Sequence, residues 1–248
     1  MRGARSRSPN APAGSPECAN SPRAAPAPGW RWRRRRPRLG LKREKHAMTV
    51  TLYHCPGTRS SGALWLLEEL GAPYELVHVD VRKGPAEDFV KINPSGKVPA
   101  IRHKGQSLGE LAAISLYLCD EFPDAGLAPE FGSPQRAAHY FWHVFRPGVL
   151  EPAMIAKSQG WIAERGMLGW GDFENMISRI ERVLETGDYL LGDAFSACDI
   201  LVGGALGWVR RFGLIEQHDT IFSYIDRLED RDAFRRVQEI DAKMAGSS

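Results

Sequence analysis

Residues 93–99 read Asn-Pro-Ser-Gly-Lys-Val-Pro, and the second proline stands at the front of a short strand pattern. Proline cannot donate a backbone hydrogen bond, so a Val98–Pro99 step fits a turn into a strand and predicts a cis peptide bond. The backbone edge of Val98 is then free to pair with an extended peptide, and Glu110 could bind the ammonium group of that peptide. The segment predicts a peptide-binding corner. The alternative is that Pro99 only shapes the start of a strand.

The chain around this corner alternates between strand and helix patterns, which predicts a small mixed sheet. Gly71 ends a helix pattern as a C′ glycine, and Lys104-Gly105 is a tight hairpin signal. The expected strands span residues 49–53, 74–79, 99–102 and 106–108, and the expected helices span residues 63–70, 86–92 and 110–122.

Strand patterns end after residue 122, where a stretch rich in proline and glycine begins. Ser196 and Asp199 form a capping box, so we interpret Asp199 as structural. Glycines at 203, 204 and 207 oppose helix formation, which predicts close helix packing. The second region should be an all-helical bundle, with apolar spacing typical of helices over residues 136–165, 172–185, 199–212 and 220–228.

Positive charge is concentrated at the N-terminus. The chain has a net charge of +3, but residues 1–47 hold 13 lysines and arginines against two acidic residues, so the rest is net acidic. We therefore expect no nucleic-acid partner for the folded part.

Residues 1–47 also hold seven prolines and few apolar residues, which predicts a disordered extension. We interpret it as translated upstream sequence, with Met48 as the true start; the alternatives are a targeting arm or a nucleic-acid-binding tail.

Four scattered cysteines show neither Cys-x-x-Cys nor metal-ligand spacing, which argues against a disulfide framework and favours the reducing cytoplasm. None of the seven histidines is paired at metal-ligand spacing, so no metal is expected. No membrane span is visible in the sequence.

The run at residues 93–99, Glu110 and their flanking elements resemble the cytosolic glutathione transferases of the bacterial type, from residue 48 to about residue 240. The resemblance implies an α/β plus all-α fold: a thioredoxin-like domain over residues 48–122, a linker over 123–133, a helical domain over 134–242 and a disordered tail over 243–248.

The family also implies a cytoplasmic homodimer that conjugates the thiolate of its co-substrate glutathione to a hydrophobic electrophile. Two different functions stay open beside this one. The first is a non-enzymatic glutathione-binding or protein-interaction module on the same fold. The second is a glutathione-dependent reductase of disulfides or peroxides that uses Cys55.

The resemblance also assigns the glutathione contacts. Val98, before Pro99, would pair with the cysteinyl part, and Glu110 would bind the γ-glutamyl ammonium group unless it only favours the helix dipole. Lys97 would meet the glycine carboxylate, or else is a solvated lysine. At Leu111 the family pattern has Ser or Thr, whose hydroxyl contacts the γ-glutamyl carboxylate. That contact is missing here, so we expect weak glutathione affinity.

The thiolate is the attacking species, so a hydrogen-bond donor must lower the pKa of the glutathione thiol. In the loop after the first strand, the hydroxyl position of the serine-type classes falls on Thr58, and Ser60 is the second candidate. The cysteine position of the bacterial class falls on Arg59, which we also place near glutathione. Ser61 and the guanidinium group of Arg59 are further candidate donors, as is Tyr53, which stands at the position of the tyrosine classes.

The electrophile should lie between the domains, against the first helix of the bundle. The candidates that we favour are Tyr140, His143 and Arg146. The wider set of aromatic candidates is Trp142, Phe145, Trp161 and Trp208, and the alternative for any of these side chains is a place in the core. Substrate identity does not follow from the pattern, because a fold does not fix a substrate.

Overall fold

The computed structural model describes residues 49–162, 164, 166–216 and 218–246. The expected extension over residues 1–47, with the proposed start at Met48, lies outside the described residues. The described chain opens with a four-stranded mixed sheet in the order β2-β1-β3-β4. Strand β1 runs parallel to β2 and antiparallel to β3, which is antiparallel to β4. The strands are β1 Val50–His54, β2 Tyr74–His78, β3 Ala100–His103 and β4 Gln106–Gly109.

Three turns have the backbone that their residues predict. The Val98–Pro99 peptide bond is cis. Gly71 has a φ of 60° and ends the first helix, with its N–H bonded to a carbonyl of the last turn. Lys104 and Gly105 have φ values of 50° and 76°, as a two-residue hairpin of the primed type requires.

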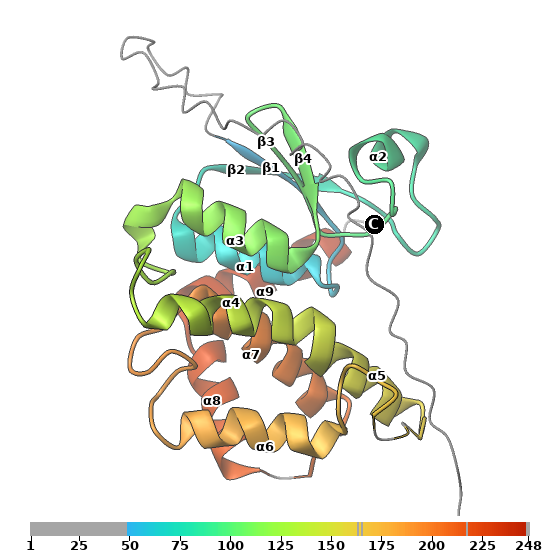
Figure 1. Cartoon of the computed structure of the whole chain (residues 1–248). Helices are drawn as coiled ribbons and strands as arrows, with labels where there is room; N and C mark the ends of the chain where they lie inside the picture. The colour runs from blue at the N-terminus through green and yellow to red at the C-terminus, as the bar shows by residue number, and fades with distance from the viewer. Residues whose placement is uncertain (1–48, 163, 165, 217, 247–248) are drawn as a thin grey trace, which may run out of the picture. The chain divides into compact units, whose positions relative to one another are not determined.

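The three helices of this region cover both faces of the sheet. Helices α1 (Ser60–Leu70) and α3 (Leu111–Glu121) lie between the sheet and the helices that follow (Figure 1). Helix α2 (Glu87–Ile92) lies on the other side, where Phe89 packs against the ring of Tyr53. The face of β1 that carries Tyr53 is therefore the face away from α1.

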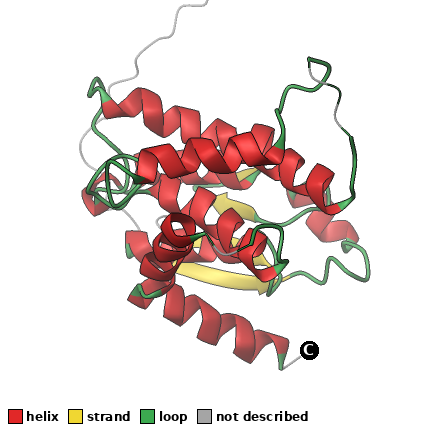
Figure 2. Ribbon diagram, turned by 90° about the horizontal axis from the view of Figure 1, so that it is seen from below, coloured by secondary structure: helices red, strands yellow, loops and turns green. Residues whose placement is uncertain are grey.

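The remaining helices form the second region and share one buried core with the first. Leu52 of β1 and Leu64 of α1 belong to the same cluster of buried residues as Leu201 and Leu206. Viewed from below, these helices lie in front of the strands (Figure 2). Among the described helices, none is long and apolar enough to cross a membrane. The helices are α4 Gln135–Phe145, α5 Glu151–Ser158, α6 Phe173–Leu184, α7 Ala197–Arg211, α8 Asp219–Glu229 and α9 Asp232–Ala245.

The stretch over residues 136–165, where the sequence shows helical apolar spacing, is divided in the structure and its helix ends early. Helix α4 passes into a π-helical segment, Arg146–Leu150, and then into α5, which ends at Ser158. Pro147 and Pro152 lack the N–H groups that a regular helix would use, and a π-helical segment accommodates such a break.

Helix α9 was not predicted from the sequence, and it packs against α1. The ring of Phe234 meets the edge of Trp65 at 5.0 Å between centroids. Arg231 forms two hydrogen bonds to the Glu69 carboxylate, from Nε at 2.6 Å and from Nη2 at 2.7 Å. The helix runs to Ala245, so residues 243–245 are helical where the sequence predicts a disordered tail.

Helix α7 begins with the predicted capping box. Asp199 is fully buried and accepts hydrogen bonds from the backbone N–H groups of Ser196 and Leu190 and from the Tyr224 hydroxyl, at 2.8–2.9 Å. Gly203 confirms the expected close packing, because a Cβ there would lie 2.0 Å from Leu228.

Candidate active site

Three segments meet at one end of the sheet. Tyr53 of β1 pairs with Ala100 of β3, and Ala100 pairs with Gly109 of β4. The loop after β1, the residues before β3 and the residues after β4 therefore lie side by side. Thr58 belongs to the first of these segments, and the structure brings the three predicted segments together.

Ser60 is fully buried, and its hydroxyl is occupied inside the loop. The oxygen accepts a hydrogen bond from the Cys55 N–H at 3.0 Å and lies 2.8 Å from both His54 Nδ1 and Thr58 Oγ1. The Ser60 side chain thus braces the loop from within, and it does not face a solvent-filled site.

Thr58 is half-buried and is the more accessible of the two leading hydroxyls. Its Oγ1 donates to the Cys55 carbonyl oxygen at 2.7 Å. A hydroxyl has one proton, so Thr58 would have to turn from that carbonyl to donate to a bound sulfur. Thr58 is also among the residues that line the first cavity described below.

Ser61 lines the first cavity as Thr58 does, but its hydroxyl is already engaged, and Tyr53 lies away from it. The Ser61 hydroxyl donates to Asp241 Oδ2 at 2.6 Å, and Tyr53 packs on the far face of the sheet. Cys55 is buried, with 1% of its surface exposed, which leaves its thiol inaccessible.

Asp241 of α9 holds this loop through three of its residues. Its carboxylate lies 2.8 Å from His54 Nε2 and accepts hydrogen bonds from the Ser61 hydroxyl and from the Gly57 N–H at 3.1 Å. Burial would raise the pKa of Asp241, but these hydrogen bonds outweigh it and lower the pKa. Asp241, His54, Ser60 and Thr58 form a continuous hydrogen-bonded chain from α9 to the candidate donor.

The predicted glutathione residues lie at the same end of the sheet. Val98 is half-buried before the cis bond, and Lys97 and Glu110 are exposed. Glu110 stands directly before α3 and has a φ of 66°, an uncommon backbone conformation for a residue other than glycine. Leu111 is buried, and a side chain at Gly62 of α1 would touch it at 3.1 Å, so Leu111 packs into the core.

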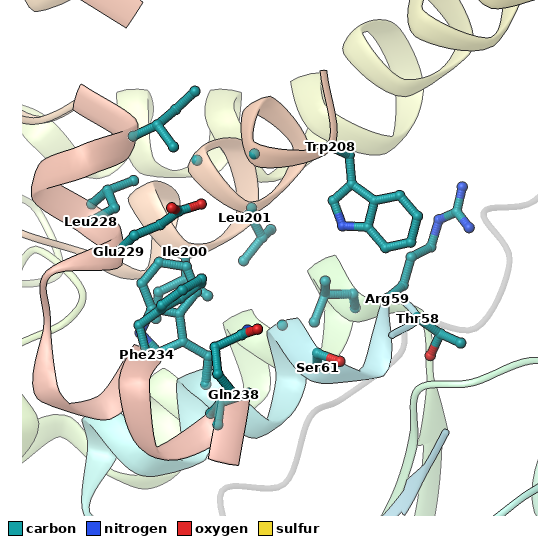
Figure 3. Close-up of a pocket in the computed structure, with 18 of the residues that line it drawn as sticks. Thr58, Arg59, Ser61, Ile200, Leu201, Trp208, Leu228, Glu229, Phe234 and Gln238 are labelled. Carbon is teal, nitrogen blue, oxygen red and sulfur yellow. The ribbon is translucent and has the colours of Figure 1, made fainter. Parts of the chain in front are cut away.

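Two cavities adjoin the loop. The first is bounded by the start of α1 and by α7 and α9, with Trp208 and Arg59 at one end (Figure 3). The second, of about 240 Å³, is bounded by α5, by Arg146 and by the end of α7. Arg59, Arg146 and Trp208 line both. Figure 3 shows Arg59 directed toward Trp208 and Thr58 directed away from it.

Of the predicted electrophile residues, Arg146 and Trp208 line the cavities. His143 is fully buried, with Nε2 at 2.9 Å from Ser115 Oγ, so it belongs to the core. Tyr140 is 43% exposed and accepts a hydrogen bond from Arg136, outside both cavities. The prediction for these two residues is corrected accordingly. The remaining aromatic candidates are also elsewhere: Trp142 and Phe145 are buried, and Trp161 is exposed.

His139, His143 and Cys198 form a buried group whose possible ligand atoms all lie within 4.8 Å of one another. The spacing of four residues places both histidines on one face of α4, so the expectation that no histidines are paired at ligand spacing is wrong. Hydrogen bonds already engage His143, since Nδ1 donates to the His139 carbonyl at 2.7 Å and Nε2 faces Ser115. Burial lowers the pKa of His139 to about 3 and that of His143 to about 4, so both imidazoles are neutral.

Comparison with known proteins decides the family. The family description "Glutathione S-transferase, N-terminal domain" matches residues 48–120, and "Glutathione S-transferase, C-terminal domain" matches residues 156–239. The chain belongs to the glutathione S-transferase family. The fold agrees, since a thioredoxin-like domain with a four-stranded mixed sheet precedes a helical domain, and the family members that the chain resembles include bacterial ones.

Individual relatives of the transferase family are similar over most of their length. Glutathione S-transferase GST-4.5 of Xanthomonas campestris pv. campestris is 25% identical over 173 residues, covering 66% of this chain and 85% of that protein. A glutathione transferase of Methylococcus capsulatus str. Bath has a TM-score of 0.66 at 28% identity, covering 78% of this chain and 98% of that one. A sphingomonad glutathione S-transferase complexed with glutathione has a TM-score of 0.65 at 29% identity, covering 77% and 98%.

The matched transferase regions leave out two residues of the site. Glu151 lies between the two matched regions, and Asp241 lies just beyond the second. Sequence reasoning also missed both residues, together with His54. Their roles depend on contacts between distant parts of the chain, for which a local pattern gives no signal.

Proposed function

We propose that this protein is a glutathione transferase that conjugates the thiolate of glutathione to a hydrophobic electrophile. The observation that carries the proposal is that the segments carrying Thr58, Val98 and Glu110 end at the same edge of the sheet. A largely apolar cavity adjoins the first of these segments at Arg59. A relative of 29% identity that is complexed with glutathione supports glutathione as the co-substrate.

In the proposed reaction, the glutathione sulfur forms a bond to the electrophilic carbon and the leaving group departs with its bonding electrons. The thiol proton passes to solvent. Lowering a thiol pKa by about two units takes about 2.7 kcal/mol. One hydroxyl hydrogen bond to the charged sulfur supplies about 1.5–3 kcal/mol, and the N-terminus of α1 adds about 0.3–1 kcal/mol.

Thr58 is the donor that we propose, because Ser60 is enclosed by the loop. Val98 would pair with the cysteinyl backbone, Glu110 would bind the γ-glutamyl ammonium group and Lys97 would meet the glycine carboxylate. Arg59 lines both cavities, but it pairs with Glu151, which lines only the second, so we assign Arg59 to the electrophile instead of to glutathione.

One observation favours a second function. Leu111 supplies no hydroxyl to the γ-glutamyl carboxylate, which suits a module that binds glutathione without turnover. The test is an assay of the purified protein with 1-chloro-2,4-dinitrobenzene at saturating glutathione, beside calorimetric titration with glutathione. Turnover above the uncatalysed rate supports the transferase; binding without turnover supports the module; neither binding nor turnover would overturn both.

We also propose that the protein is a cytoplasmic homodimer, as the family implies. Phe131, Tyr140 and Val144 expose 73%, 43% and 67% of their surface near and along α4, and burial of such apolar groups against a second copy would stabilise a dimer. Light scattering after size exclusion tests the dimer, and a monomer at micromolar concentration contradicts it.

A further inference from the structure

The second cavity contains two guanidinium groups that share one carboxylate. Arg59 Nε is hydrogen-bonded to Glu151 Oε1, and Arg146 Nη1 lies 3.6 Å from Glu151 Oε2. Among the described residues that line this cavity, Glu151 is the one acidic group. The three charged side chains therefore carry one net positive charge.

The rest of this wall is mainly apolar. Its larger members are Met154, Ile155, Trp208, Phe212 and Leu214. Solvent screens Arg146 poorly, since 9% of its side chain is exposed, whereas Arg59 is half-exposed. An anion that reaches Arg146 would therefore be attracted strongly.

Arg146 has an unused donor. Its surface is 7% exposed, and among the described residues its Nε has no hydrogen-bond partner. Burial lowers the pKa of Arg146, with a smaller contribution from Arg59, and together these outweigh the opposing effect of Glu151. A buried donor without a partner is costly, and a ligand that supplies an acceptor removes that cost.

We propose that the electrophile taken by this cavity is an apolar molecule that carries an anionic group, such as a carboxylate, and that Arg146, assisted by Arg59, binds this group. The proposal rests on the proposed transferase function. A carboxylate can accept two parallel hydrogen bonds from a guanidinium fork. Trp208, which lines the same cavity, offers an apolar ring for the rest of the molecule.

The test compares two electrophiles that differ in one charge, 4-chloro-3,5-dinitrobenzoate and its methyl ester. In both, the glutathione sulfur bonds to the ring carbon, the carbon–chlorine bond breaks, chloride leaves with the electron pair and the thiol proton goes to solvent. Each kcat/KM is divided by the second-order rate constant of the uncatalysed reaction with glutathione, because the ester is intrinsically the more reactive electrophile. The quantity measured is the ratio of the normalised value for the carboxylate to that for the ester.

We expect the wild-type ratio to exceed one. R146M should lower the ratio about ten- to hundredfold, the loss for one hydrogen bond to a charged group. E151Q should raise it about three- to tenfold, because the carboxylate that competes for both arginines is gone. The matched control is R235M, since Arg235 pairs with Asp230 and Asp232 and lines neither cavity; its ratio should equal that of the wild type.

A second measurement separates this inference from the proposed function. Binding of 3,5-dinitrobenzoate and of its methyl ester, which have no leaving group, is followed by calorimetry in the same variants. Preference for the carboxylate without turnover of either electrophile overturns the transferase proposal and supports the anion site. Turnover of the ester with no preference for the carboxylate overturns the anion site and supports the transferase. If R146M does not fold, E151Q decides the question alone. A ratio in E151Q that is equal to or lower than the wild-type ratio overturns the anion site.

Discussion

Asp241 and His54 lie 187 residues apart in the sequence, and their side chains meet at 2.8 Å between Oδ1 and Nε2. The contact joins α9 to the loop that carries Thr58. Asp241 also accepts hydrogen bonds from the Gly57 N–H and the Ser61 hydroxyl, so a single carboxylate holds both sides of this loop.

Replacing Asp241 by alanine should lower the free energy of unfolding by about 2–3 kcal/mol, because the partly buried donors of the loop lose a charged acceptor. Urea denaturation measures the change. The matched control is D230A: Asp230 is exposed and pairs only with Arg235 among the contacts described, and its loss should cost less than about 1 kcal/mol. Equal stability of D241A and D230A would contradict the role of Asp241.

Replacing Thr58 by valine removes the proposed donor to sulfur at nearly constant volume. We expect kcat/KM for glutathione to fall about ten- to hundredfold, and the apparent thiol pKa in the pH–rate profile to rise by about one to two units. T58S keeps a hydroxyl and should restore most of the activity. A T58V profile that matches the wild type would remove Thr58 from the mechanism.

Leu111 predicts weak binding of glutathione. Replacing it by serine supplies the missing hydroxyl and should tighten the dissociation constant about tenfold. The same change removes a buried side chain, so the free energy of unfolding should fall by about 2–4 kcal/mol. Calorimetry on folded protein decides the first effect. Tight binding by the wild type, or no gain in L111S, would contradict the interpretation.

The adjacent glycines of α7 should respond oppositely to alanine. A Cβ at Gly203 would lie 2.0 Å from buried Leu228, whereas a Cβ at Gly204 meets nothing within 4 Å. We expect G203A to lower the free energy of unfolding by about 1–3 kcal/mol and G204A to raise it by up to about 1 kcal/mol through helix propensity. Thermal denaturation of the pair tests this, and two changes of the same sign would be inconsistent with the packing.

The two buried histidines of α4 should make stability depend on pH. The pKa of His139 is lowered to about 3 and that of His143 to about 4, mainly by burial, while an unfolded histidine has a pKa near 6.5. Their contribution to the free energy of unfolding is therefore complete above pH 6.5. It is lost as the pH falls below 6.5, because the histidines of the unfolded chain take up protons before those of the folded chain.

Between pH 7 and pH 5 this loss should be about 2 kcal/mol for each histidine. Urea denaturation at several pH values gives the slope. In H139Q the slope over this range should fall by about half. A wild-type stability that stays level from pH 7 to pH 5 would contradict the burial of neutral imidazoles.

Local signals predicted the parts of the fold that depend on a few neighbouring residues. Gly71, Lys104-Gly105, the Val98–Pro99 step and the Ser196–Asp199 capping box each impose their backbone geometry without help from distant residues. The resemblance also placed Thr58, Val98 and Glu110 at one corner, and their segments do meet there, because strand pairing follows from the order of the elements.

Side-chain direction was harder to predict. Ser60 and Thr58 differ by two positions, yet one is enclosed and the other is half-exposed, because α1 begins between them. His143 and Tyr140 share α4 with no sequence sign of which turns inward. Helix α9 was missed although Ala233, Val237 and Ile240 recur at helical spacing. Its arginine–glutamate pairs with α1 join distant parts of the chain, so no local pattern reveals them.

The position of Asp241 in the chain also sets an order of events during synthesis. The ribosome completes the sheet and the Thr58 loop early, and α9 is the last helix of the described chain to emerge. Until α9 has emerged, water takes the place of the Asp241 carboxylate as the hydrogen-bond partner of Gly57, Ser61 and His54. A nascent chain would therefore hold a folded thioredoxin-like domain whose Thr58 loop is still loose, and the proposed activity would begin only when translation has passed Asp241.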